Sequence, residues 1–314
     1  GTYWGAPSTF FYPYRGAWSK SDPELRYVPV GTGKPGDYLT DKLTEHAIQF
    51  IKERKERPFF VSLWYHTVHT PIEAKQEAIS HFKEKPPGVI HKHAVYAAML
   101  TSLDENIGRL LDTLRQLELD RETIVILTSD NGGVDFPSGK SGGAPPTSNS
   151  PWRSGKGTLY EGGIRVPLMI HWPGTTQPGS VCNEPVLSQD FYSTLASEIG
   201  VQDADIPQND GVNLLPLIKG EQLKLPSRAL FWHYPHYYPR MTPASAVRDG
   251  NWKLIHYYED DRVELFDLAN DRSERADLAT TYPMRAKQLK QQLDQWRESI
   301  GANAPKPNPD WHEK

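Results

Sequence analysis

The sequence predicts an α/β protein in which a mostly parallel sheet is sandwiched by helices and followed by a small antiparallel sheet with one helix. Continuously apolar runs at residues 58–66, 123–129 and 164–172 alternate with segments of helical periodicity. This alternation is typical of a parallel sheet covered on both faces. Beyond about residue 220 the pattern changes to short strand-like segments separated by turns, which predicts the antiparallel part.

The elements of the first part follow in chain order. Residues 1–37 are rich in aromatic residues, Pro and Gly and predict a loop. A helix follows, since Leu39, Leu43, Ala47, Phe50 and Ile51 recur at helical spacing. The run Pro58–His66 predicts the first buried strand, and residues 123–129 and 164–172 predict two more. A helix over 188–200 ends at Gly200. Before the second strand lies a long amphipathic helix whose predicted apolar face is Tyr96, Leu100, Leu103, Ile107, Leu110, Leu114 and Leu117.

The C-terminal part predicts three strand-like segments and a helix. "ALFWHY" and "VELFDL" flank "SAVRDGNWKLIHYY", which predicts a hairpin turning at Asp249-Gly250. The last helix presents Leu289, Leu293, Trp296 and Ile300 and stops at Gly301. We therefore expect two domains, with residues 1–220 as the larger α/β domain and residues 221–314 as a small α+β subdomain.

The bulk composition excludes several classes of protein. The 314 residues are 37% hydrophobic and 24% charged with a formal net charge of -4, which is an ordinary globular profile. No apolar run approaches the ~20 residues of a membrane span, and no basic stripe indicates a nucleic-acid partner. The single cysteine, Cys182, excludes an internal disulfide framework and a multi-cysteine metal site.

Polar side chains gather where the predicted strands of the first part end. His66 and His69 end the first run, Asp130 and Asn131 follow the second, and Lys156 precedes the third. Ligands of doubly wound sheets bind beyond the carboxyl ends of the strands. Asp with Asn suits a hard cation such as calcium or magnesium, Lys156 suits an anionic substrate oxygen, and His69 suits proton donation.

Each of these features also has a structural interpretation. "SDNGG" is good turn chemistry, in which Gly132 and Gly133 permit positive φ. A His after a strand is often structural, and a Lys between glycines is often a solvated loop residue. "SGKS" at 138–141 fails as a phosphate-binding loop because Val134 stands where its first Gly belongs. The two His are spaced like a zinc pair but lack the helical H-E-x-x-H string.

"WYHTVHTP", "SDNGG" and "GKGTLYEGGIRVPLMIHWPG" together resemble the formylglycine-dependent sulfatases of the alkaline-phosphatase superfamily. "DGVNLLPLIKG" resembles their connecting segment, and "VELFDLANDRSERADLA" their small C-terminal domain. The resemblance implies an alkaline-phosphatase-like fold and hydrolysis of sulfate esters with one calcium ion. It implies Asp130 and Asn131 as calcium ligands, Lys156 as the contact to the sulfate group, and His69 as the donor to the leaving alcohol. Phosphatase relatives commonly place His after the strand-end Asp, so Asn131 favours the sulfatase branch.

The resemblance also implies parts that this sequence lacks. The family makes its formylglycine nucleophile in a C-x-P-S-R type motif, which neither "VCNEPV" around Cys182 nor "SPWR" at 150–153 matches. The only adjacent Asp pair, Asp260-Asp261, lies in a predicted solvated turn. We expect the nucleophile and further calcium ligands in a missing N-terminal portion, either on a complementing chain or lost through truncation of one longer chain. The resemblance implies a periplasmic, secreted or lysosome-like location.

The segment "FWHYPHYYPR", Phe231–Arg240, suggests the substrate. Its prolines make a strand interior unlikely beyond Tyr234, so we expect a loop over the active-site mouth. Aromatic faces stack on sugar rings, which predicts a sulfated carbohydrate as substrate. The predicted substrate-binding residues are His233, His236, Arg240 and Arg153. The alternative functions are a non-catalytic protein that binds sulfated glycans and a phosphoester hydrolase of the same superfamily.

Overall fold

The computed structural model describes residues 8–14, 33–137, 144–201, 207, 209–306 and 308–310. The chain forms two compact units, Gly1–Thr123 with Asp130–Val166 and Ile124–Ser129 with Pro167–Lys314. These units divide the chain at places other than residue 220, and the domain boundary expected there stays a prediction. Within the described ranges, no helix is long and apolar enough to cross a membrane. The "SGKS" string at 138–141 lies outside these ranges.

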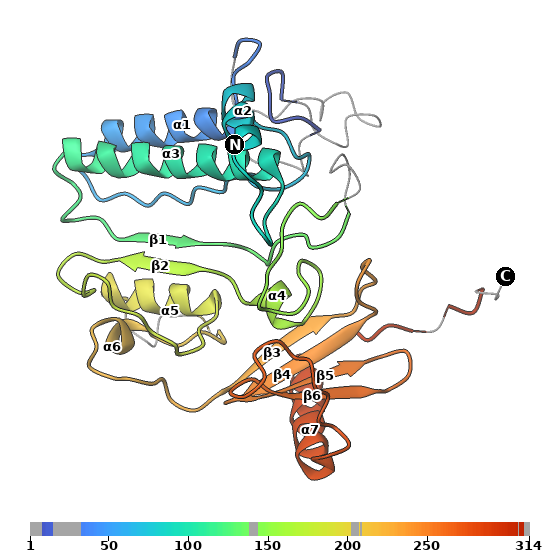
Figure 1. Ribbon diagram of the computed structural model, residues 1–314. Coiled ribbons are helices and arrows are strands. Elements are labelled where there is room, and N and C mark those ends of the chain that lie inside the picture. Colours follow the sequence, from blue (N-terminus) through green and yellow to red (C-terminus); the bar gives the residue numbers. More distant parts are fainter. Residues whose placement is uncertain are drawn as a thin grey trace. The chain divides into compact units, whose positions relative to one another are not determined.

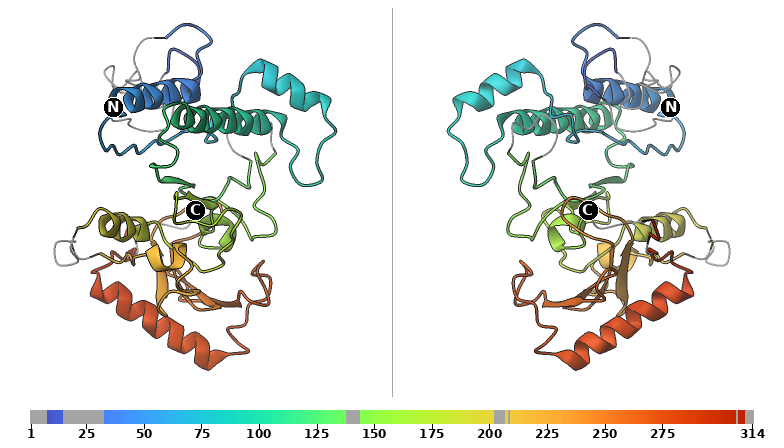
Figure 2. Two further views of the ribbon diagram at one scale, coloured as in Figure 1. Left: turned by 90° about the vertical axis from the view of Figure 1, so that its left-hand side faces the viewer. Right: turned by 90° about the vertical axis from the view of Figure 1, so that its right-hand side faces the viewer.

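The described part of the first unit contains α1 (Leu39–Arg54), α2 (Gln76–Glu84), α3 (Ala94–Gln116) and the one-turn helix α4 (Glu161–Ile164). Of these helices, α3 packs against α1 and α2 (Figures 1 and 2). The predicted helices at both α1 and α3 are confirmed. Just before α1, Tyr38 forms an antiparallel bridge with Phe11, which brings the two segments together. The buried core of this unit gathers side chains from both segments, from α3 and from the stretch before α2: Phe10, Tyr14, Tyr38, Leu39, Ile72, Ala74, Ala98 and Met99.

Of the predicted leucine-rich face of α3, Leu114 is buried, and the other buried residues of the helix are Ala98, Met99, Ser102, Asn106 and Thr113. Leu100 is 46% exposed, whereas Ser102 and Asn106 are 1% exposed. The Asn106 Nδ2 donates to Asp41 Oδ1 of α1 and to Ser102 O, at 2.7 Å each. Small and polar side chains let the two helix backbones approach closely, so they occupy the α1 contact. The periodicity therefore predicted the helix correctly but not which face its neighbours bury.

The strand predicted at Pro58–His66 is wrong, since this segment belongs to neither sheet of the described residues. It runs beside α1, where Thr44 Oγ1 and Tyr65 OH lie 2.7 Å apart. Burial alternates along it, with Phe60 and Trp64 at 77% and 82% exposed. A strand exists only with a neighbour to take its backbone hydrogen bonds. No described residue supplies that neighbour.

In the second unit, two of the predicted strands are confirmed as β1 (Val125–Thr128) and β2 (Leu168–His171). They pair antiparallel, with Val125 opposite His171 and Thr128 opposite Leu168. The parallel pairing expected from the sequence is therefore not found, because both sheets of the described residues are antiparallel. Apolar periodicity does not encode strand direction, and large α/β sheets often carry an antiparallel edge strand.

The C-terminal sheet and helix match the sequence prediction closely. The sheet has the order β3-β4-β5-β6, and β4 and β5 form the predicted hairpin, in which Gly250 has a φ of +61°. The helix α7 lies against β4 and β5 (Figure 1). Its Trp296 stacks on Phe231 of β3 with ring centroids 4.7 Å apart. The elements are β3 (Ala229–Tyr234), β4 (Ala244–Asp249), β5 (Trp252–Tyr257), β6 (Val263–Asp267) and α7 (Pro283–Ser299).

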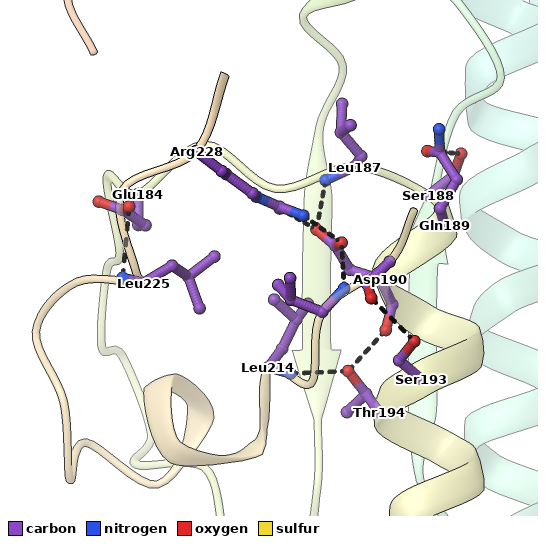
Figure 3. Close-up of polar contacts among 12 residues, drawn as sticks. Glu184, Leu187, Ser188, Gln189, Asp190, Ser193, Thr194, Leu214, Leu225 and Arg228 are labelled. Atoms are coloured by element: carbon purple, nitrogen blue, oxygen red, sulfur yellow. Dashed lines mark hydrogen bonds and ion pairs between the residues drawn. The ribbon is translucent and has the colours of Figure 1, made fainter. Parts of the chain in front are cut away.

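A buried carboxylate joins the middle of this unit to the C-terminal sheet (Figure 3). Asp190 lies in the first turn of α5 (Gln189–Glu198) and is fully buried. It accepts a hydrogen bond from the Val212 N–H at 3.0 Å, and Arg228 NH1 and NH2 lie 2.8 and 2.5 Å from its two oxygens. Arg228 directly precedes β3, so this contact fixes the segment that enters the sheet. The short helix α6 (Leu215–Ile218) lies between these attachment points.

Candidate active site

Asp130 and Asn131 follow β1 in the chain, as the sequence predicted. The Asn131 N–H donates to Asp130 Oδ1 at 2.9 Å, and Asn131 Nδ2 donates to Gly132 O at 3.1 Å. Because the amide nitrogen is used in this way, the amide oxygen is turned away from the Gly132 carbonyl. The Asp130 side chain is exposed. Two oxygen-bearing groups are thus held next to each other at the start of a loop.

Lys156 is tied to this loop through the backbone. The Lys156 N–H donates to Gly133 O at 3.1 Å, and the Gly132 N–H donates to Gly163 O at 2.9 Å. Gly157 has a φ of +79°, which turns the chain directly after Lys156. The structure therefore brings the candidate cation ligands and the candidate sulfate contact into one hydrogen-bonded group of segments.

Glycine is needed in these segments because their backbones approach each other closely. The positive φ expected from the sequence is not the reason. Neither Gly132 nor Gly133 has a positive φ. A Cβ on Gly132 would lie 1.7 Å from Gly162 O, and one on Gly155 would lie 2.2 Å from Gly133 O. No side chain fits at such distances. The "YEGG" string, which directly precedes the third run, thus belongs to the candidate site because its backbone lies against the "DNGG" backbone.

Arg153 lies in the same group of segments but packs on an aromatic ring. Its guanidinium carbon is 3.8 Å from the centroid of the Tyr160 ring, and Tyr160 is buried. The Arg153 carbonyl accepts from the Gly162 N–H at 2.9 Å. A cation–π contact of this kind orients the side chain. Its role in substrate binding stays a prediction.

His69 belongs to the same compact unit and closes a turn. Its N–H donates to His66 O at 2.7 Å, and its Nδ1 lies 2.8 Å from Thr70 O. A carbonyl only accepts, so Nδ1 carries a proton in this contact. The His69 side chain is exposed. Burial, with a smaller contribution from His69, lowers the pKa of His66, which favours the neutral form of that imidazole.

The other predicted substrate residues, His233, His236 and Arg240, belong to the second compact unit. Strand β3 ends at Tyr234, as the prolines predicted. His233 is the next-to-last residue of β3, and both its ring nitrogens have protein partners, with Nδ1 2.8 Å from Ser245 Oγ and Nε2 2.9 Å from Asn303 O. His236 and Arg240 are exposed.

Asp130 and Asn131 offer the oxygen donors that calcium prefers, but these two residues offer too few to complete its coordination. Calcium takes six to eight oxygens, and these side chains offer a carboxylate and an amide oxygen. Over the part of the chain that the structure describes, no group of three or more His, Cys, Asp or Glu could hold a metal ion. Asp260-Asp261 lies in the exposed turn before β6, in keeping with a solvated position. A complete cation site therefore requires further ligands.

Comparison with known proteins identifies the family of this chain. The family profile described as "Sulfatase" matches residues 2–201. The chain belongs to the sulfatase family. A second profile, described as "N-sulphoglucosamine sulphohydrolase, C-terminal", matches residues 153–299. The resemblance of the "DNGG" and "GKGTLYEGG" segments to sulfatases is confirmed.

The relatives within this family are considerably longer. A sulfatase of Formosa agariphila is 34% identical over 78% of this chain and 47% of its own length. The steryl-sulfatase of Mus musculus is 30% identical over 83% of this chain and 45% of its own length. The chain thus spans about half the length of these relatives.

A solved structure supports the fold. The structure named Ps i-CgsB in complex with k-i-k-neocarrahexaose has a TM-score of 0.70 and 28% identity. The matched region covers 88% of this chain and 60% of the chain in the solved structure. Together with the family match, this likeness confirms the predicted alkaline-phosphatase-like α/β class.

Proposed function

We propose that this chain is part of an enzyme that hydrolyses sulfate esters, with Asp130, Asn131, Lys156 and His69 in its active site. The observation that carries the proposal is the bond from the Lys156 N–H to Gly133 O. It joins the backbone at Lys156, whose side chain carries an ammonium group, to the segment that bears the proposed cation ligands. Such a pairing suits an anionic sulfate ester, because both positive charges act on the oxygens of one sulfate group.

Calcium is the cation that we propose for Asp130 and Asn131. When bound, it supplies positive charge that stabilises the developing negative charge on sulfate. The hydrogen bonds within Asp130-Asn131-Gly132 keep two acceptor oxygens in place for it. We propose that the remaining ligands, and the formylglycine needed for attack on sulfur, lie outside this chain.

Lys156 and His69 have separate roles in this proposal. The Lys156 ammonium holds a sulfate oxygen and neutralises charge as the bond between sulfur and the ester oxygen breaks. The departing ester oxygen takes up a proton. His69 supplies it as an imidazolium from Nε2, since Nδ1–H is held by Thr70 O. The ring is then left neutral, with its remaining proton on Nδ1.

A sulfated carbohydrate is the substrate class we propose. The support is the exposed His236 and Arg240 beside the aromatic residues of 231–240, a C-terminal family profile named for a sulphoglucosamine sulphohydrolase, and the sugar in a similar solved structure. Steryl-sulfatases are also among the relatives. A steroid sulfate is therefore the competing substrate that an assay must include.

The first test is Lys156→Ala in the full-length enzyme, meaning this chain within a polypeptide of its relatives' length. We expect kcat to fall by a factor corresponding to roughly 3–4 kcal/mol, because the contact acts on the reacting group. The matched control is Lys42→Ala on α1, whose ammonium pairs with Glu45 at 3.1 Å. Full activity of the Lys156→Ala enzyme would remove Lys156 from the site.

The second test compares substrates. We expect His236→Ala combined with Arg240→Ala to impair hydrolysis of a sulfated saccharide far more than hydrolysis of a small aryl sulfate or a steroid sulfate. Equal losses on all three, or none, would exclude this segment from substrate binding. The glycan-binding alternative would be favoured if the wild-type protein binds a sulfated saccharide saturably but hydrolyses no sulfate ester. The phosphoester hydrolase would be favoured if the wild-type protein releases phosphate from a phosphoester but no sulfate from any sulfate ester.

A further inference from the structure

The side-chain amide of Asn149 forms hydrogen bonds with the backbone of the candidate site through both its oxygen and its nitrogen. Its Oδ1 accepts from the Gly133 N–H at 2.9 Å, and its Nδ2 donates to Gly133 O at 2.9 Å and to Ser154 O at 3.0 Å. Gly133 is two residues after Asn131, and Ser154 is two residues before Lys156. One amide group therefore bridges the segment with the cation ligands and the segment with the ammonium.

The surrounding backbone is shaped to receive this amide. A Cβ on Gly155 would lie 2.6 Å from Asn149 Nδ2, and a Cβ on Gly133 would lie 3.3 Å from Asn149 Oδ1. Ser154 has a φ of +59°, which is unfavourable for a residue with a side chain. The hydrogen bond from Asn149 to the Ser154 carbonyl offsets part of that cost. Two donors and one acceptor are needed here, a combination that Asp cannot offer when ionised.

We propose that Asn149 is a positioning residue. It fixes the backbone segment that carries Lys156 relative to the segment that carries Asp130 and Asn131. The inference rests on the proposed sulfatase function, since its consequence for catalysis depends on these three residues acting together. Among the described residues, the hydrogen bonds of the Asn149 side chain go to Gly133 and Ser154 and not to Lys156 or Asp130. Its effect passes through Gly133 O, which accepts both from Asn149 Nδ2 and from the Lys156 N–H.

Asn149→Asp in the full-length enzyme tests this role. The substitution keeps the shape but sets a carboxylate against the carbonyls of Gly133 and Ser154. We expect kcat to fall about 10- to 100-fold at pH 7.5, as for loss of groups that orient reacting residues. Lowering the pH should raise the ratio of the variant's kcat to the wild-type kcat, because the introduced Asp carboxyl regains one hydrogen-bond donor when it is protonated. Asn149→Ala should act in the same direction and covers the case in which the Asp variant does not fold.

Asn106→Asp is the matched control. Asn106 also uses two donors and one acceptor, to Asp41, Ser102 and Arg109, and lies in α3. We expect this variant to lower the melting temperature while kcat of the folded enzyme stays near that of wild type. A purely structural role for Asn149 predicts that the two variants behave alike.

Amide hydrogen exchange separates the positioning role from the proposed function. We expect faster exchange in residues 131–134 and 154–158 of the Asn149 variants and wild-type exchange there in Asn106→Asp. Unchanged exchange at 154–158, or an equal loss of kcat in the Asn106 variant, would overturn the inference. If the wild-type enzyme cleaves no sulfate ester, the proposed function fails, and the exchange pattern still decides whether Asn149 holds the two segments together.

Discussion

Gly132 illustrates how single residues set the geometry of this site. Its N–H donates to Gly163 O at 2.9 Å, and an added Cβ would lie 1.7 Å from Gly162 O. The neighbouring atom is backbone and not the end of a flexible side chain. Relief of such a contact must move one of the two segments. The positions of Asp130 and Asn131 therefore depend on a residue that has no side chain.

In the full-length enzyme, we expect Gly132→Ala to lower the free energy of unfolding by roughly 1–3 kcal/mol, as overpacking does, and to weaken the stabilisation that calcium gives. The measurement is denaturant unfolding with and without calcium. Gly108→Ala is the control, because Gly108 lies within α3 and its added Cβ meets nothing within 4 Å. That change should stabilise by about 0.5–1 kcal/mol. Similar effects of the two substitutions would contradict the close-approach argument.

At the scale of elements, α5 is the anchor for the chain that enters the C-terminal sheet. Besides the contacts of Asp190, the Thr194 Oγ1 donates to Asp190 O at 2.7 Å and accepts from the Leu214 N–H at 2.8 Å. These bonds attach the segment before α6 to the first turns of α5 (Figure 3). Arg228, directly before β3, completes the attachment. The apolar pattern of these segments does not predict this attachment.

Asp190→Ala should cost roughly 3–5 kcal/mol of unfolding free energy, because it leaves the Arg228 charge without its buried partner. Adding a second change, Arg228→Leu, should recover part of this loss, since the unpaired charge is then removed. Asp112→Ala serves as the control, because its ion pair with Arg115 is exposed and should matter by less than about 1 kcal/mol. A loss from Asp190→Ala as small as that of the control would show that the anchor is dispensable.

At the scale of the whole molecule, the segment from Phe59 to Tyr65 carries apolar surface that the described residues leave uncovered. Phe60 and Trp64 are 77% and 82% exposed and lie four residues apart in a segment of alternating burial. Single exposed apolar residues are common, whereas two exposed aromatic side chains in one short segment favour association.

We expect the 314-residue chain by itself to bind a hydrophobic dye or to aggregate. Phe60→Ser combined with Trp64→Ser should reduce dye binding and light scattering. The control combines Val181→Ser with Leu223→Ser, which are 84% and 89% exposed at isolated positions and should change little. A monodisperse wild-type chain that melts cooperatively without dye binding would refute this expectation.

Much of the fold follows from local sequence patterns. Apolar runs predicted β1 and β2, and Asp249-Gly250 predicted the β4–β5 hairpin. Gly200 and Gly301 marked the ends of α5 and α7, and both have positive φ. The candidate residues Asp130, Asn131 and Lys156 were also found by their chemistry and their place beside predicted strands. Side-chain period, turn chemistry and ligand type are properties of a few neighbouring residues, so a sequence displays them directly.

The tertiary structure alone decided the features that depend on segments distant in sequence. It showed which face of α3 is buried, that Pro58–His66 pairs with no strand among the described residues, and that His233 bonds to Ser245 and Asn303. It also revealed Asn149, which reaches a glycine 16 residues away, and the glycine contacts around it. Close backbone approach and multiple hydrogen bonds arise only when the chain has folded back on itself. No local pattern encodes which segments will meet.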